Sequence, residues 1–478
     1  MNNLLLPIFP ELFVLAMSLV ILMIGVFSKH GAPRVSFYLS QITLLLAAFF
    51  VLHVFVLCGR QSTFAFHHMF VLDSLSVSLK ILVLIAMVLT LGYSDSYNKI
   101  NCIPANEFYV LSLLSTLGMM ILVSSTNFLT LFLGLELMSL PIYAMAALMR
   151  SKDRCIEAAM KYFIIGAVAS GMLLYGFSLL FGATHSLDLQ TVSTAIAETP
   201  LTQNLILLFA LVFVIAGLAF KLGAAPFHSW VPDVYDGAPN SVTLLISAAP
   251  KLAAFGLFVR VLMYGVPSLH VQWDHVLIAL GLLSIAIGNL VAIVQTNIKR
   301  LLAYSSIAHI GFIMLGLGCG TVRGDGAAFF YMVTYALTSL GAFGVITLLS
   351  RTDFDANELS DFAGLSQTQP WLAFMMLLMM FSLAGIPPLV GFMAKLGILE
   401  ALISAHSVWL AVVAIIFSII GVYYYIRVVK VMYFEESHRS EKVNCSPSVT
   451  LVMSMNGLMV LLLGIFPSQL FILCHSVF

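Results

Sequence analysis

Long apolar segments alternate with short polar connections along the whole chain. About 20 helical residues cross the hydrocarbon core of a bilayer, so each long apolar run predicts one transmembrane helix. One run is too long for a simple span, and Gly385-Ile386-Pro387-Pro388 divides it. The pattern predicts an all-helical membrane protein with about fourteen spans, near residues 4–27, 35–58, 71–93, 107–124, 126–148, 156–182, 203–222, 240–263, 273–294, 301–318, 326–350, 370–403, 408–433 and 449–473.

The connections are too short to hold a soluble module, so residues 1–478 are predicted to form a single integral membrane domain. Residues 60–70 are too polar to span, and their alternation predicts a small hairpin. No basic residue precedes the first apolar run, which is unlike a cleavable signal peptide, so the first helix is expected to stay. The predicted divisions are three N-terminal helices in 1–106, repeats in 107–263 and 273–433, and a last helix in 449–473.

Two spans share an unusual combination of residues. In the seventh span, Lys221 is followed by Gly223 and Pro226, and in the twelfth span Lys395 follows the Gly385–Pro388 break. Paired Gly/Pro interruptions in corresponding spans are typical of inverted-repeat transporters with discontinuous helices. We therefore expect two inverted five-helix repeats, formed by spans four to eight and nine to thirteen, with the seventh and twelfth helices broken. A proline kink alone is common in membrane helices and is the alternative for either break.

Composition agrees with the pattern and excludes several functions. The chain is 61% hydrophobic and only 9% charged, far below the roughly 25% charge of soluble domains. Its formal net charge is zero, so nothing suggests a nucleic-acid partner. The six cysteines are scattered without a CxxC pair, and the twelve histidines offer no convincing haem arrangement. We therefore expect no metal, no redox centre and no other cofactor in this chain.

Basic residues in the connections predict the orientation. Cytoplasmic loops carry an excess of Lys and Arg. Only Arg60, Arg260 and Arg323 lie in or beside the loops after even-numbered spans. Both termini are therefore expected outside the cytoplasm, because the loops after odd-numbered spans, with their flanking span ends, hold thirteen basic residues: Lys29, Arg34, Lys99, Arg150, Lys152, Arg154, Lys299, Arg300, Arg351, Arg427, Lys430, Arg439 and Lys442.

Five ionisable side chains lie inside apolar segments: Glu136, Lys161, Lys221, Lys251 and Lys395. A charge at the bilayer centre costs roughly 2.5–3.5 kcal/mol on insertion scales, so such groups are retained mainly where they pair, line water or carry ions. A carboxylate with four lysines indicates a proton path. The alternatives are a hydrogen-bonded packing defect at Glu136 and snorkelling at Lys161, which is nearer a span end.

Other polar residues extend or flank this set. His228, just beyond Pro226, and His309, in the tenth span, are placed to relay protons, although either can be a satisfied buried polar group. Lys80 lies about two turns from Asp73, which permits a local pairing, and Glu11 at the start of the first span is expected at the interface. The run Tyr423–Tyr425 is interpreted as packing or as an interfacial anchor.

Several motifs together resemble a known family. They are LFLGLELMSLP and AAMKYF, GLAFKLGAAPFHSWVPDVYDGAP and PKLAAF, then QTNIKRLLAYSSIAHIGF and FSLAGIPPLVGFMAKL. They resemble the N-subunit family of the bacterial proton-pumping NADH:quinone oxidoreductase, respiratory complex I. The pattern KxxxxPFHxWxPDVYxGAP is highly specific, and the match covers nearly the whole chain. The M-type sister has a glutamate where this chain has Lys395, and the L-type sister continues into a long lateral helix.

The resemblance implies a function and a location. The family's proton path corresponds by position to Glu136, Lys161, Lys221, Lys251 and Lys395. Quinone reduction elsewhere in the complex would drive proton translocation, while NADH oxidation, flavin and iron–sulfur chemistry would belong to other subunits. The chain would thus be an enzyme only as a subunit of a translocase. Its partners would be the M-type sister, the small membrane subunits and the lipid of a bacterial inner membrane. Pro250, directly before Lys251, departs from the family pattern.

Two alternatives remain at this point. A Mrp-type cation/proton antiporter uses the same fold and would show sodium-dependent transport. A quinone-binding electron-transfer subunit would need haem-ligating histidine pairs or cysteine clusters.

Overall fold

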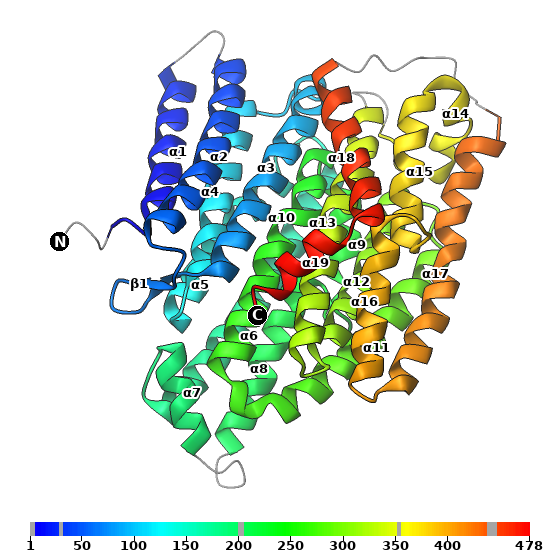
Figure 1. Cartoon of the computed structure of the whole chain (residues 1–478). Helices are drawn as coiled ribbons and strands as arrows, with labels where there is room; N and C mark the ends of the chain where they lie inside the picture. Colours follow the sequence, from blue (N-terminus) through cyan, green and yellow to red (C-terminus); the bar gives the residue numbers. More distant parts are fainter. Residues whose placement is uncertain (1–4, 28–31, 199–204, 351–354, 437–446) are drawn as a thin grey trace. The chain divides into compact units, whose positions relative to one another are not determined.

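The computed structural model describes residues 5–27, 32–198, 205–350, 355–436 and 447–478, and nearly all of them are helical (Figure 1). Four of the basic residues used to predict orientation, Lys29, Arg351, Arg439 and Lys442, lie outside these ranges. The chain separates into two compact units. Unit 1 contains residues 1–91, 102–222 and 249–273, and unit 2 contains residues 92–101, 223–248 and 274–478.

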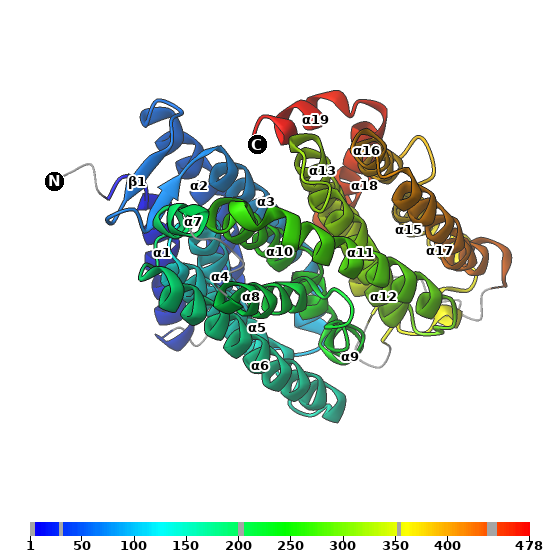
Figure 2. The same cartoon turned by 90° about the horizontal axis from the view of Figure 1, so that it is seen from below.

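Unit 1 is a helical bundle with one hairpin. Helix α1 packs on α2 and α4, α4 packs on α5, and α6 packs on α5 and α8 (Figures 1 and 2). Its elements are α1 (Phe9–Phe27), α2 (Ala32–Leu57), β1 (Thr63–Ala65), β2 (Phe70–Leu72), most of α3 (Ser74–Ile100), α4 (Ala105–Ser124), α5 (Phe128–Ala146), α6 (Asp153–Thr184), α7 (Leu189–Glu198), α8 (Leu205–Leu222), the second half of α10 (Asn240–Val259), a π-helical turn at Arg260–Gly265 and a 3₁₀ turn at Pro267–Leu269.

Unit 2 is built around α13, which packs against α12, α15, α16, α18 and α19. Its elements are α9 (Trp230–Gly237), the first half of α10, most of α11 (His270–Ile293), α12 (Ile298–Leu317), α13 (Val322–Leu349), a 3₁₀ turn at Leu359–Phe362, α14 (Leu365–Thr368), α15 (Pro370–Ala384), α16 (Val390–Ser404), α17 (Val408–Phe434), α18 (Pro447–Ile465) and α19 (Ser468–His475).

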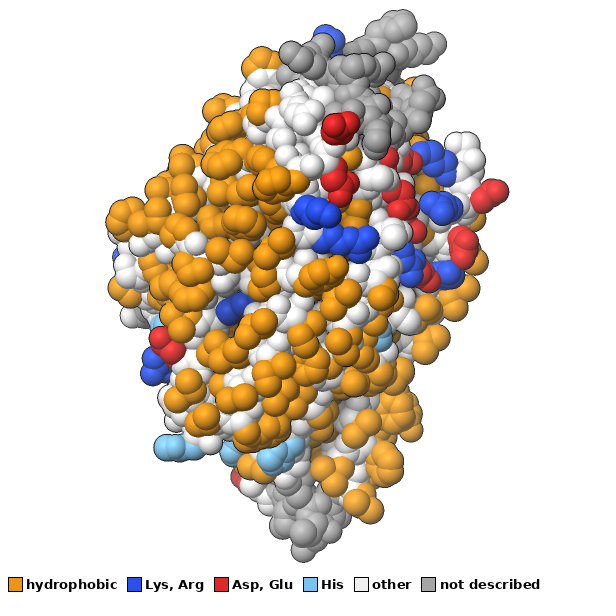
Figure 3. Space-filling view, turned by 90° about the vertical axis from the view of Figure 1, so that its right-hand side faces the viewer, with side chains coloured by type: hydrophobic (Ala, Val, Ile, Leu, Met, Phe, Trp, Pro, Cys, Tyr) orange, Lys and Arg blue, Asp and Glu red, His pale blue; other side chains and the backbone are white. Residues whose placement is uncertain are grey.

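Within the described ranges, twelve helices are long and apolar enough to cross a membrane, and α18 with α19 passes the same test as one pair bent by 83°, either a broken span or a re-entrant loop. Each of the fourteen predicted apolar runs contains one of these helices or a broken pair, with α15 and α16 forming the divided run. The predicted all-helical membrane fold is therefore confirmed, while the inverted repeats stay a prediction. On the face in Figure 3, hydrophobic side chains cover most of the surface, and charged side chains gather toward one end.

The predicted helix breaks are present. Helix α8 ends at Leu222, and Gly223 follows with a φ of +79°. Helix α15 ends at Ala384, and Gly385 takes a φ of +82°, a left-handed conformation that glycine adopts without a Cβ penalty. The N–H groups of Gly385 and Ile386 both donate to the carbonyl of Phe381, which closes the helix end. Local glycine and proline chemistry therefore sets both breaks.

The predicted hairpin is also present. Strands β1 and β2 pair antiparallel, with Thr63 opposite Leu72 and Ala65 opposite Phe70. Its turn contains three consecutive residues with positive φ, at 66–68.

A close helix crossing holds α5 in place. A Cβ added to Gly118 of α4 would lie 2.2 Å from the backbone N of Met138 on α5. Small residues at such crossings let membrane helices approach closely. This contact fixes the part of α5 that carries the polar residues described next.

Candidate functional site

In unit 1, Lys221 lies at the end of α8 and reaches toward α5. Its Nζ donates to Ser139 Oγ at 3.3 Å and to Tyr143 OH at 3.4 Å. Glu136 lies on α5 one turn before Ser139, and its charge interacts with that of Lys221. The buried Oε1 of Glu136 has no hydrogen-bond partner in the described part of the chain. Glu136 and Lys221 therefore lie where α5 meets α8, and the Ser139 and Tyr143 hydroxyls accept hydrogen bonds from the Lys221 ammonium.

The other two lysines of unit 1 differ sharply in exposure. Lys161 Nζ is 2.8 Å from Glu157 Oε1 across one turn of α6, and the two side chains are 43% and 66% exposed. Lys251 is only 2% exposed. The α-helix continues through Pro250, which precedes Lys251, and changes to a π-helical turn only at Arg260. Lys161 thus lies at the surface of unit 1, where snorkelling stays possible, and Lys251 lies inside it.

In unit 2, Lys395 of α16 binds the carbonyl end of α15. Its Nζ donates to Ala384 O at 2.8 Å and to Ser418 Oγ at 2.9 Å, and lies 5.7 Å from the centre of the Phe312 ring. Ala384 is the last residue of α15, and the last carbonyls of a helix lack partners in the helix itself. The predicted break therefore creates the acceptor that the lysine uses.

A chain of buried hydrogen bonds surrounds His309. Its Nδ1 is 2.7 Å from Tyr331 OH and its Nε2 is 3.0 Å from Tyr425 OH, which is 2.5 Å from Ser305 Oγ. Tyr425 is buried, and its hydroxyl contacts His309, a contact that the sequence did not predict. The tyrosine triplet gave no signal of this, since only the packing of α17 on its neighbours turns Tyr425 inward while Tyr423 stays exposed.

A small cavity lies beside His309. It has a volume of about 10 Å³ and is lined by His309, Tyr331, Tyr335, Thr338, Ser382 and Ala394, among others. That volume is about the minimum that holds one water molecule. The Thr338 and Ser382 hydroxyls are 3.4 Å apart, and Ala394 directly precedes Lys395. The cavity thus places the Thr338 and Ser382 hydroxyls beside His309, while Lys395 follows one of its lining residues in sequence.

His228 lies in the connection before α9. Its ring is edge-on to Tyr304 of α12, with 6.4 Å between ring centres. Its buried Nδ1 lacks a hydrogen-bond partner among the described residues. His228 therefore packs against α12, the helix that also carries Ser305 and His309.

Sequence analysis missed Lys299, which it placed among the loop residues. Lys299 is 3% exposed, and its Nζ donates to Asp236 O at 2.8 Å and to Asn240 Oδ1 at 3.1 Å. Its neighbour Arg300 pairs with Asp233 at 2.9 Å. Asp236 lies in the last turn of α9, where exposed carbonyls attract cations. The sequence signal that could have indicated these contacts is the pair of acidic residues Asp233 and Asp236, together with the adjacent basic residues Lys299 and Arg300.

One expected pairing and one expected location were wrong. Lys80 does not pair with Asp73, because its Nζ lies 2.6 Å from Glu11 Oε1, and Glu11 is buried rather than interfacial. Asp73 instead receives two hydrogen bonds from Arg260, at 2.8 and 2.6 Å. Lys80 and Asp73 lie on one chain segment, but the neighbouring helices present better partners to each.

Two lysines lie at helix breaks: Lys221 near the carboxylate of Glu136, and Lys395 in the unit that holds the buried hydrogen bonds of His309. This arrangement is typical of antiporter-like membrane proteins. Residues 125–421 match the family described as NADH:quinone oxidoreductase/Mrp antiporter, transmembrane. Within the described residues, no group of three or more His, Cys, Asp or Glu side chains could hold a metal ion.

The curated relatives narrow the class. The chain is 58% identical to NADH-quinone oxidoreductase subunit N of Coxiella burnetii, over 99% of this chain and 98% of that protein. It is 51% identical to the same subunit of Herminiimonas arsenicoxydans, over 100% of this chain and 98% of that protein. The chain therefore belongs to the family of NADH-quinone oxidoreductase subunit N.

Solved structures share the fold. A chain of respiratory complex I from Thermus thermophilus with bound aureothin superposes with a TM-score of 0.82 at 31% identity, covering 97% of this chain and 98% of that one. A chain of the Mrp complex from Dietzia sp. DQ12-45-1b reaches a TM-score of 0.86 at 20% identity, covering 98% and 96%, which shows likeness of fold alone.

Proposed function

We propose that this chain moves protons across the membrane as an antiporter-like subunit of a NADH-quinone oxidoreductase. The observation that carries the proposal is the placement of Lys395, whose ammonium donates, within the described residues, to the neutral acceptors Ala384 O and Ser418 Oγ. A lysine on neutral partners can release its proton and leave no unpaired charge behind. Membership in this family implies that quinone reduction in other subunits drives the proton movement.

The proposed switch is Glu136 with Lys221. At an effective dielectric of about 20, a carboxylate and an ammonium 4 Å apart attract by roughly 4 kcal/mol, which changes proton affinity by about three orders of magnitude. Lys221 is held by the Ser139 and Tyr143 hydroxyls, so approach toward Glu136 or retreat from it requires only the exchange of neutral hydrogen bonds. Such a movement would load or release a proton.

The other proposed members of the proton path are Lys161 and Lys251 in unit 1 and His228, His309 and Lys395 in unit 2, with Lys395 as the terminal site. The hydroxyls of Tyr425 and Tyr331 flank both ring nitrogens of His309, so the ring can accept a proton on one side and donate on the other. The cavity beside it has room for the one water needed to continue toward Thr338 and Ser382. Electrons are expected to stay in other subunits.

The orientation and partners follow from the same assignment. The excess of basic residues in loops after odd-numbered spans favours both termini on the periplasmic side of the inner membrane. The proposed neighbours are the M-type sister and the small membrane subunits. A reporter fused to the C-terminus should be active in the periplasm, and activity in the cytoplasm would contradict the orientation.

The second candidate is a Mrp-type cation/proton antiporter, which the shared fold favours. Transport in vesicles separates the two. The complex containing this chain should acidify vesicles when NADH and quinone are supplied, equally well in sodium and in potassium buffers. A protonophore provides the control, because it must abolish the gradient. Proton movement that needs sodium and continues without NADH would support the antiporter and contradict the proposed function.

A further inference from the structure

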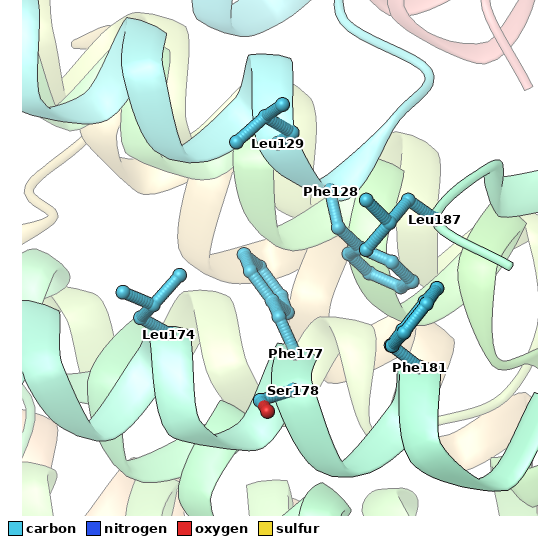
Figure 4. A pocket seen from close by; sticks show the side chains of 7 residues that line it. All are labelled: Phe128, Leu129, Leu174, Phe177, Ser178, Phe181 and Leu187. Atoms are coloured by element: carbon cyan, nitrogen blue, oxygen red, sulfur yellow. The ribbon is translucent and has the colours of Figure 1, made fainter. Parts of the chain in front are cut away.

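An apolar hollow opens on the surface of unit 1 between α5 and α6. It has a volume of about 230 Å³ and is lined by Phe128, Leu129, Leu174, Phe177, Ser178, Phe181 and Leu187. Figure 4 shows these side chains converging from α5, α6 and the segment after α6. Leu129, Leu174 and Phe181 are also exposed on the outer surface. The hollow is therefore open laterally and suits a hydrocarbon chain.

A larger polar cavity lies directly beside this hollow. It has a volume of about 500 Å³, and its polar lining includes His68, Asp73, Thr126, Asp188, Ser193 and Arg260. One short backbone ladder forms a wall of both spaces. Phe128 N donates to Leu187 O at 2.9 Å, and Leu189 N donates to Thr126 O at 3.0 Å. Consecutive residues thus line different spaces, Leu187 the apolar one and Asp188 the polar one.

The charges of the polar cavity are only partly used within the protein. Arg260 donates through Nε to Val123 O and through both terminal nitrogens to Asp73. A guanidinium has five N–H groups, so one remains on each terminal nitrogen. In the described part of the chain, Asp188 accepts from the backbone and the hydroxyl of Thr191, both through Oδ2. An anion beside Arg260 would accept the remaining guanidinium hydrogen bonds, and a cation beside Asp188 would pair with its carboxylate.

We propose that this paired site binds one glycerophospholipid whose zwitterionic headgroup carries a primary ammonium. Its phosphate accepts from Arg260, its ammonium donates to Asp188, and part of one acyl chain fills the hollow. The hydroxyls of Thr126, Ser193 and Thr194 supply further acceptors, which a primary ammonium can use and a quaternary ammonium cannot. Because Asp73 already neutralises Arg260, a purely anionic headgroup finds no uncompensated positive charge there.

Two variants separate the halves of the site. Asp188→Asn removes the charge and keeps a good N-cap for α7, since asparagine caps as well as aspartate. Leu174→Trp fills the apolar hollow. Leu133→Trp is the matched control, because Leu133 is exposed on α5 and does not line the hollow. None of these residues belongs to the proposed proton path.

The assembled complex would be delipidated in mild detergent and exposed to phosphatidylethanolamine, phosphatidylcholine or phosphatidylglycerol. Bound lipid per complex would be measured by mass spectrometry after removal of excess. We expect retention of phosphatidylethanolamine by the parent and by Leu133→Trp. In Asp188→Asn its affinity should fall about tenfold or more, as expected for loss of a hydrogen bond to a charged group. In Leu174→Trp retention should also fall.

Equal retention in the parent, Asp188→Asn and Leu174→Trp would overturn the site. Retention of phosphatidylcholine or phosphatidylglycerol at the level of phosphatidylethanolamine would overturn the assignment of a primary-ammonium zwitterion. Each variant must show the parent's subunit composition, so that loss of lipid is not loss of assembly. If one of them fails to assemble, Phe181→Trp replaces Leu174→Trp and Asp188→Ser replaces Asp188→Asn, with the same expected and contradicting results.

Discussion

Lys80 and Lys395 are both lysines within apolar helices, yet their surroundings differ. Lys80 is completely buried, with its Nζ 2.6 Å from Glu11, which is itself 2% exposed. Lys395 donates to a backbone carbonyl and to a serine hydroxyl. Removing the proton from Lys80 would leave the Glu11 carboxylate buried without a counter-charge, which is strongly unfavourable. Deprotonated Lys395 would leave only neutral groups.

The comparison teaches that a charge within the membrane does not by itself indicate a proton path. Lys80 and Arg260 have carboxylate partners at hydrogen-bond distance, so their charges are held. Lys221 is intermediate, because neutral hydroxyls hold its ammonium while Glu136 acts on it electrostatically. The lysines held by neutral groups, Lys221 and Lys395, lie next to helix breaks, whereas Lys80, which is paired with a carboxylate, lies within α3.

The largest expected effect is at Lys395. Lys395→Arg keeps the positive charge but cannot release a proton, because the guanidinium pKa exceeds about 12. We therefore expect both Lys395→Arg and Lys395→Met to lower proton translocation per NADH oxidised by about tenfold or more, about 1.4 kcal/mol or more in the barrier. Reconstituted vesicles, normalised to assembled complex, provide the measurement. Lys430→Met is the matched control, since Lys430 is 67% exposed. Normal pumping by Lys395→Arg would show that Lys395 is only a fixed charge.

A smaller but still large loss is expected from the switching pair. Glu136→Gln and Lys221→Met should each lower pumping severalfold, and the double variant should lose little more than either single one. Residues that act as a unit are non-additive in this way. A double-mutant cycle on pumping rates, with assembly checked for each variant, gives the coupling. Additive losses would mean that Glu136 and Lys221 act separately.

The buried ion pair of Lys80 and Glu11 should affect stability rather than pumping. Lys80→Met leaves Glu11 buried and unpaired, and breaking a buried ion pair from one side typically costs about 3–5 kcal/mol. The double variant Lys80→Met with Glu11→Leu should recover most of this loss, because neither charge remains. Thermal unfolding of the assembled complex reports the stability. Pumping per assembled complex should stay normal, and a specific pumping defect in the double variant would place the pair in the proton path.

The smallest expected effect concerns acid stability at Asp73, which precedes α3. Burial acts to raise the pKa of Asp73, but the charge and hydrogen bonds of Arg260, with those of Ser76, bring it below its ordinary value of 3.8. A lowered pKa means that the carboxylate stabilises the fold above about pH 4, and that this contribution disappears as the pH falls through the folded-state pKa.

Asp73→Asn should therefore be less stable than the parent at pH 7, by about 2 kcal/mol for charged hydrogen bonds lost at one site. Denaturation at pH 7, 5 and 3.5 provides the measurement. The difference between variant and parent should be equal at pH 7 and 5 and smaller at pH 3.5. A difference that grows as the pH falls would have the opposite sign and would contradict the role of Arg260.

The sequence by itself determined the membrane class, the spans, the hairpin and both helix breaks. These features depend on local rules: a run of about 20 apolar residues must satisfy its backbone as a helix. Gly385 ends α15 because its left-handed conformation closes the helix, and prolines cannot continue the ladder. The motifs also pointed to the five proton-path residues, although their roles stay predictions.

Only the tertiary structure decided which group each charge meets. Asp73 and Arg260 are 187 positions apart, and Lys221 is 78 positions from Tyr143. The helical period tells which residues share a face, but the partner depends on the rotation and axial offset of another helix. Lys80 therefore met Glu11 instead of Asp73, and Tyr425 turned toward His309. Long-range packing sets these contacts, and no local pattern in the chain encodes them.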